Sequence, residues 1–186
     1  MVRVNSSDTA AIPALRSLTK PQYQSFRHVL LELIKADDQI DLFEWSLNRI
    51  LQHSLSPQFG KASPPAVKYQ SLGRLQPECQ LLLSSLAHVG HDDPEQIRLA
   101  FDHGAMSLHL KLGLLSDDKC ELDRLDRALG ALNLASPRLK RQLLIACAAC
   151  VSADAKITAQ EAELFRAISD TLGCPMPPLL PGQPLS

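Results

Sequence analysis

A chain of 186 residues with 45% apolar side chains can bury a sizeable core, so wholesale disorder is excluded. Aromatic residues make up only 4%, while leucine and alanine are abundant, and this composition favours helices over strands. The formal net charge of −1 comes from 19 basic and 20 acidic residues without a long basic run, so nucleic-acid binding is disfavoured.

The chain is expected to be soluble as it stands, with no direct membrane insertion. Its first nine residues carry no apolar segment of the kind that opens a secretory signal. The longest apolar stretch without a charge, 142–153, is far shorter than the roughly 20 residues that span a bilayer. Five cysteines form an odd set without framework spacing, which predicts free thiols in a reducing compartment.

The first half of the chain predicts one pair of helices. Residues 1–12 form a loose lead-in without periodicity. Thr19 can cap a helix that runs to about Ile34, and a second helix begins at Leu42 and reaches about Leu51. The segment 54–65 holds three prolines and one glycine, and it is the clearest linker.

Five further helices are predicted beyond this linker. Their apolar spacing and breakers place them over 77–89, 94–112, about 122–132, from 138 to about 151, and 162–172. The tail 175–186 has five prolines and cannot continue a helix.

One pattern occurs twice, each time between two predicted helices. It reads Ala-Asp-x-x-Ile-x-x-x-Glu, first from Ala36 to Glu44 and again from Ala153 to Glu161. The repeat predicts two related helix-turn-helix units, about 19–54 and 135–172, around a middle block of about 65–133. We therefore expect a single all-α domain of about seven or eight helices over 13–174, built by internal duplication.

The repeated turn has a structural interpretation. Asp37 and Asp154 can each accept backbone N–H groups of the turn. Thr158 and Glu161 fit the S/T-x-x-E capping box. Glu44 and Glu161 are expected as exposed charges near a helix N-terminus, where the helix dipole favours an acidic side chain by about 0.3–1 kcal/mol.

The alternative interpretation of the turn is a divalent-cation site. The pattern matches the second half of an EF-hand loop, in which an acidic residue, an isoleucine and a final glutamate recur. The first-half ligands are absent, because Leu33 and Lys35, or Cys150 and Ser152, occupy those positions. A weaker carboxylate site joining both turns stays open, and its candidate ligands are Asp37, Glu44, Asp154 and Glu161.

Other motifs carry little chemistry. Cys147 and Cys150 form a C-x-x-C inside a predicted helix, which fits core packing better than redox or zinc chemistry. Surface or capping roles are expected for the four histidines near one predicted hairpin, His88, His91, His103 and His109. No H-E-x-x-H, G-x-S-x-G or phosphate-binding glycine loop occurs, so the chain itself is expected to lack enzymatic activity and a bound cofactor.

Both copies of the repeat resemble the tellurite-resistance TerB-like helical family, whose pattern is Ala-Asp-Gly-x-Ile-x-x-x-Glu. Asp38 and Ala155 stand where that pattern has glycine. A closer resemblance covers about 12–182 and is carried by "LRSLTKPQYQSFRHVLLELIKADDQIDLFEWSLNRIL" and "AELFRAISDTLGCPMPPLLPG". These segments are similar to the C-terminal region of bacterial membrane-embedded zinc metallopeptidases related to HtpX.

The resemblance implies a TerB-like, non-catalytic domain that regulates a protease or binds a protein partner. The parent protease would hold the zinc and lie in the bacterial inner membrane, with this domain on the cytoplasmic side. Its partner would be the attached protease domain or another protein. The second hypothesis is a divalent-metal-responsive module that uses the two acidic turns.

Overall fold

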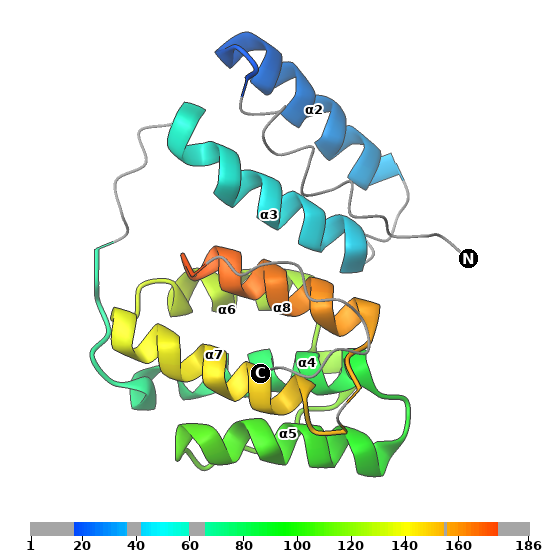
Figure 1. Cartoon of the computed structure of the whole chain (residues 1–186), viewed down its shortest axis with the longest axis vertical. Helices are drawn as coiled ribbons and strands as arrows, with labels where there is room; N and C mark the ends of the chain where they lie inside the picture. The colour runs from blue at the N-terminus through cyan, green and yellow to red at the C-terminus, as the bar shows by residue number, and fades with distance from the viewer. Residues whose placement is uncertain (1–16, 37–41, 60–65, 155, 175–186) are drawn as a thin grey trace. The chain divides into compact units, whose positions relative to one another are not determined.

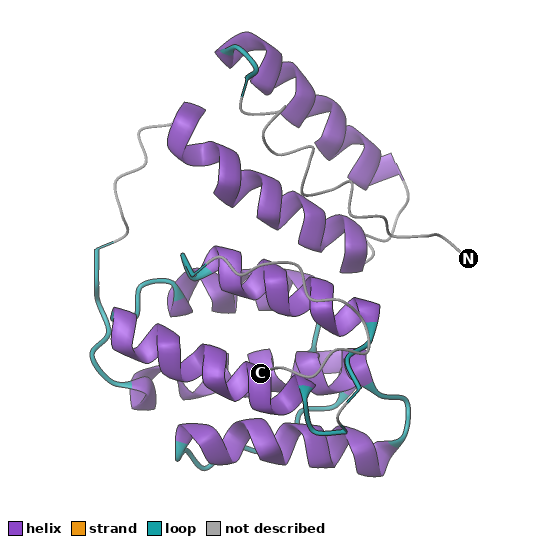
Figure 2. Cartoon of the chain, in the orientation of Figure 1, coloured by secondary structure: helices purple, strands orange, loops and turns teal. Residues whose placement is uncertain are grey.

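The chain is all-α. The computed structural model describes residues 17–36, 42–59, 66–154 and 156–174. Across these ranges it contains seven α-helices, two short 3₁₀ helices and no strand (Figure 2). The expected class and the expected number of helices are therefore confirmed. The backbone divides into two compact units, Met1–Pro64 and Pro65–Ser186, and each is described by itself. The prediction of a single domain over 13–174 stays a prediction.

The first unit is a pair of helices, α2 (Lys20–Ala36) and α3 (Leu42–Phe59). Thr19 precedes α2, and its backbone N–H and its hydroxyl both donate to Oε1 of Gln22, at 2.8 Å each. Tyr23 and Leu51 are buried at the centre of a small apolar cluster that also includes Leu18, Phe26 and Leu47. Val29 of α2 is 52% exposed, so only some of the apolar residues of α2 contribute to this cluster.

The predicted linker is partly helical. Helix α3 continues through Ser54 and Pro57 and ends at Phe59, and the remaining residues of the segment, 60–65, lie outside the described residues. A proline inside a helix removes one backbone hydrogen bond and crowds the carbonyl four residues earlier, which ends or kinks the helix near that point. Helix α3 ends two residues after Pro57, so the prediction of a break already at residue 54 was wrong.

The second unit contains five α-helices and both 3₁₀ helices (Figure 1). Their bounds are η1 Leu72–Leu75, α4 Gln76–Gly90, α5 Pro94–Leu108, η2 Asp117–Lys119, α6 Leu122–Leu132, α7 Pro137–Val151 and α8 Ala159–Thr171. Helix α4 packs against α5, α6, α7 and α8. A helix surrounded in this way should be apolar on most faces. In α4 every residue from Leu81 to Ala87 is buried.

Helices α5 and α7 form the most extensive contact of this unit, and Gly104 allows their close approach. A Cβ atom at Gly104 would lie 2.9 Å from Cδ2 of Leu83 and 3.0 Å from the carbonyl oxygen of Ala146. Both separations are shorter than ordinary van der Waals contact, so a larger residue would push the helices apart.

Two helix boundaries differ from the predicted ones. Helix α5 ends at Leu108, four residues before the expected position, because His109 takes a left-handed conformation with φ of 56°. Its N–H then donates to the carbonyl of Met106 and closes the last turn. Helix α8 begins at Ala159, three residues before the expected start, because Thr158 caps it.

No helix in the described ranges is both long enough and apolar enough to cross a membrane.

Candidate functional site

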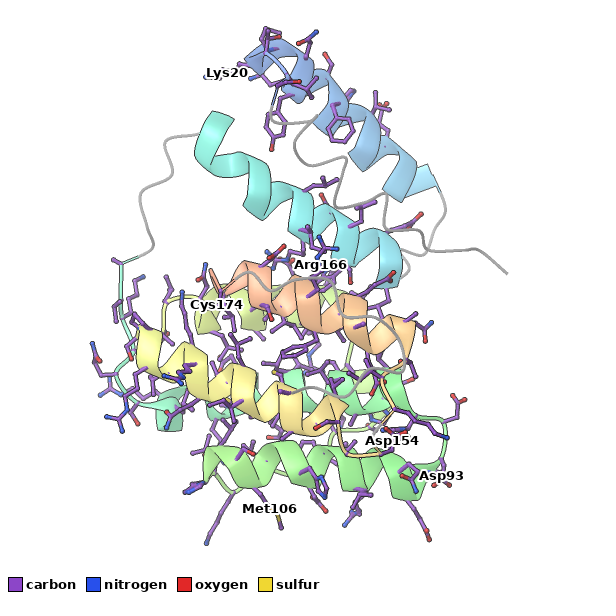
Figure 3. The ribbon with its side chains drawn as sticks, in the orientation of Figure 1. Lys20, Asp93, Met106, Asp154, Arg166 and Cys174 are labelled. Atoms are coloured by element: carbon purple, nitrogen blue, oxygen red, sulfur yellow. The ribbon has the colours of Figure 1, made fainter. Side chains whose placement is uncertain are left out.

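The second copy of the repeated pattern forms a tight turn between α7 and α8. After Val151 the helix closes with the N–H of Ser152 donating to the carbonyl of Ala148 at 3.0 Å. Oδ1 of Asp154 accepts the backbone N–H of Lys156 at 2.9 Å. This is the hydrogen bond expected of an aspartate in a turn. Asp154 lies in the loop that joins the two helices (Figure 3).

Thr158 and Glu161 close the start of α8 with a complete capping box. Oγ1 of Thr158 accepts the N–H of Glu161 at 3.1 Å. Oε2 of Glu161 accepts both the N–H and the hydroxyl of Thr158, each at 2.8 Å. The box satisfies two backbone donors that a helix N-terminus leaves open. The capping interpretation of these two residues is confirmed.

Glu161 is buried and not, as the sequence suggested, an exposed helix-end charge. Only 1% of its surface is accessible. Its carboxylate packs on Gly90, the last residue of α4: a Cβ there would overlap Oε1 and lie 2.6 Å from Cδ. Burial, and after it the charge of Glu161, raises the pKa of the Cys150 thiol to about 12. Glu161 thus fastens the start of α8 to the end of α4.

His91 extends this contact. It directly follows α4, its side chain is 8% exposed, and its Nδ1 lies 4.0 Å from Oδ2 of Asp154. Nε2 of His91 is buried and has no hydrogen-bond partner among the described residues. The two carboxylates of the turn therefore both face the C-terminal end of α4. The sequence did not indicate that His91 would approach Asp154, since 62 residues lie between them.

The metal interpretation receives no geometric support from the second turn. Each of its carboxylates has one oxygen bonded to local backbone. In the ranges that the structure describes, no group of three or more His, Cys, Asp and Glu residues could hold a metal ion. Of the first copy, Glu44 lies half-buried in the first turn of α3, and Asp37 falls outside the described residues. A site joining both turns stays a prediction.

The C-x-x-C residues are part of the core. All five cysteines are free thiols, and Cys79, Cys147 and Cys150 are buried. Burial raises the pKa of Cys79 to about 12 and that of Cys147 well above its ordinary value. A thiol reacts and binds metal as its thiolate. These three cysteines are therefore buried thiols that pack in the core, where the thiolate form is disfavoured.

The three other histidines near the predicted hairpin, and the single tryptophan, have no ligand-like arrangement in the described residues. A ring nitrogen of His88, Nε2, lies 2.8 Å from the carbonyl of Leu115. His109 caps α5, and His103 is exposed on the same helix. Trp45 is 7% exposed, with the guanidinium carbon of Arg49 5.7 Å from its ring centroid.

In comparisons with known proteins, no family model, no curated protein and no solved structure matched this chain.

Replacing Asp154 with alanine should destabilise the protein by about 0.5–2 kcal/mol, the scale of a lost cap. Alanine removes the acceptor for the N–H of Lys156. Asp154→Asn is the matched control, because an amide oxygen keeps that acceptor and only the charge beside His91 is lost. Urea unfolding with and without millimolar calcium measures both. Equal losses for the two variants, or a loss that disappears without calcium, would contradict this account.

Proposed function

We propose that this chain is a non-catalytic regulatory or protein-interaction domain. It acts as the C-terminal part, outside the bilayer, of a bacterial membrane-bound zinc metallopeptidase. The family resemblance of the first hairpin and the tail supports this context. The protease domain would carry the zinc and the catalytic residues, and this region would act through contacts with that domain or with another protein.

One observation carries the non-catalytic part of the proposal. Several side chains of the second unit that could act as an acid, a base or a nucleophile instead stabilise its fold. Glu161 is buried in a capping box, and Asp154 braces a turn. Cys150 has a pKa near 12, so it stays protonated at physiological pH. These side chains therefore support a structural role, and the protein would bind a partner through its surface.

The isolated chain should show no peptidase activity. Purified protein would be incubated with casein and with quenched fluorescent peptides, with and without zinc. We expect rates equal to those of buffer, because the sequence lacks H-E-x-x-H and G-x-S-x-G and the described Asp154, Glu161 and Cys150 hold the fold. Cleavage that co-purifies with the chain and disappears with chelator would contradict the proposal.

The membrane context has its own test. Sequencing the gene on the N-terminal side of this region should find H-E-x-x-H and membrane-spanning segments in the same reading frame. In membranes that contain the full protein, deleting residues 17–174 should change the rate or choice of substrate while zinc-dependent cleavage persists. A frame without those elements would overturn the link to a protease, and unchanged cleavage would overturn the regulatory role.

A further inference from the structure

A cleft of about 520 Å³ opens at one end of the second unit. Three segments that lie far apart in the sequence form it: the start of η1, the end of α5 and the first turn of α7. Figure 1 shows these helix ends at the same end of the unit. The extended residues before η1 are held there by Tyr69, whose carbonyl accepts the N–H of Ser136 at 3.0 Å. The cleft is therefore built by tertiary contacts.

The lining of the cleft combines apolar and polar side chains. Leu72, Leu108 and Leu139 are buried, and Leu110 is half-buried. Glutamines and serines share the lining with them. Leucine side chains beside polar groups suit a ligand that brings both apolar anchors and hydrogen-bonding groups. The volume is larger than a free inorganic anion needs, so the cleft fits part of a larger molecule.

The segments that form the cleft carry charged residues of one sign. The three contributing segments, 66–77, 106–115 and 133–145, contain no aspartate or glutamate. Arg138 lines the cleft, and four more exposed cations lie one or two positions from lining residues: Lys68, Arg74, Lys111 and Arg141. None of these five forms an ion pair with another residue in the described ranges. These segments therefore have a net positive charge, in a chain with more acidic than basic residues.

The start of α7 adds to the positive character. Ser136 occupies the N-cap position, but its side chain makes no capping hydrogen bond. Pro137 has no N–H, and the N–H of Lys140 donates to the carbonyl of Ser136. The first turn therefore offers the N–H groups of Arg138 and Leu139, where the helix dipole also favours negative charge.

We propose that this cleft docks an acidic segment of a partner protein, with one or two apolar side chains entering between the leucines and carboxylates meeting the surrounding cations. Complementary charge of this kind guides association and selects partners. A nucleic acid fits less well, because stacking platforms and an extended basic track are the usual means of binding single strands. This inference rests on the proposed function in one respect, that the chain works through protein contacts.

The experiment selects ligands without assuming a partner. A random-peptide phage library is panned against the purified chain, and the best peptide is labelled with fluorescein for anisotropy titrations. We expect enriched peptides to be acidic with leucine or another large apolar residue. Arg138→Glu should weaken binding at least about tenfold, since it replaces an attraction with a repulsion. Glutamate is favourable in the first turn of a helix, so this variant should keep its fold.

Arg98→Glu is the matched control. Arg98 is exposed in the first half of α5, away from the helix end that lines the cleft, and the variant has the same net charge. We expect Arg98→Glu to bind the peptide as the wild type does. The inference is overturned if no peptide or only neutral and basic ones are enriched, if both variants bind equally, or if a single-stranded oligonucleotide binds more tightly. It is also overturned if the chain forms a dimer that Arg138→Glu dissolves. None of these results touches the peptidase assay, which tests the non-catalytic role separately.

Discussion

Replacing Gly90 with alanine should destabilise the protein by about 1–3 kcal/mol, the usual cost of overpacking a filled site. The new methyl group would overlap Oε1 of Glu161, whose other oxygen is held by Thr158. Glu161 has no solvent-exposed position to retreat to without leaving its capping box, because only 1% of it is accessible. The intrinsic preference of helices for alanine, about 1 kcal/mol at most, opposes this loss but is smaller. Urea unfolding followed by circular dichroism measures the difference.

Gly130→Ala is the matched control. Gly130 lies in α6, and apart from its chain neighbours and its own helix backbone no atom lies within 4 Å of the position that a Cβ would take. Alanine there should stabilise the protein by about 0.5–1 kcal/mol through helix propensity alone. The sign of the effect at Gly90 should also reverse when Glu161 is already alanine, because the overlap is then gone. A loss at Gly90 that persists in the Glu161→Ala background would contradict the contact between α4 and α8.

Glu161→Ala should cost about 2–4 kcal/mol. It removes half of a capping box, and it leaves the N–H of Thr158 without its acceptor in a part-buried position. Glu161→Gln should lose less than half as much, because the amide oxygen can still accept both hydrogen bonds from Thr158. The two variants separate the geometry of the cap from the charge of the carboxylate.

Thermal and urea unfolding of both Glu161 variants provide the measurement, with Thr158→Ala as a comparison that removes the other side chain of the box. Thr158→Ala should cost about 0.5–2 kcal/mol. If Glu161→Ala proved as stable as the wild type, Glu161 would not fasten α8 to α4.

The helices and the cap were predictable because their signals are local. Apolar spacing located α4, α6 and α7 within one residue of their ends. Thr158 and Glu161 are three positions apart in the sequence, which is the spacing that a capping box requires. The end of α5 was not predictable, because histidine in a left-handed conformation leaves no distinct mark in a sequence.

The burial of Glu161 depends on a distant residue. A glutamate in the first helical turn is usually solvated, and only the missing side chain of Gly90 makes room for it. In the sequence Gly90 indicates only the end of a helix, and its contact with Glu161 cannot be predicted from it. The same holds for His91 beside Asp154. Contacts between residues so far apart depend on helix packing, which a single sequence does not specify.

The basic cleft was missed for a related reason. A search along the chain finds no long run of lysine and arginine, and that observation disfavoured only nucleic-acid binding. Lys68, Lys111 and Arg138 lie on segments that the fold brings to one end. The grouping of these cations depends on the fold, so it could be found only from the structure.

We expect the acidic turn at Asp154 and Glu161 to brace the fold without binding a cation. The most direct test is a calorimetric titration of chelator-treated protein with calcium, magnesium and zinc in turn, together with melting curves at millimolar cation. We predict no saturable heat and no rise in melting temperature, since no cation would stabilise the folded state by linkage. A saturable isotherm with a matching rise in melting temperature, both lost in Glu161→Gln, would contradict the claim.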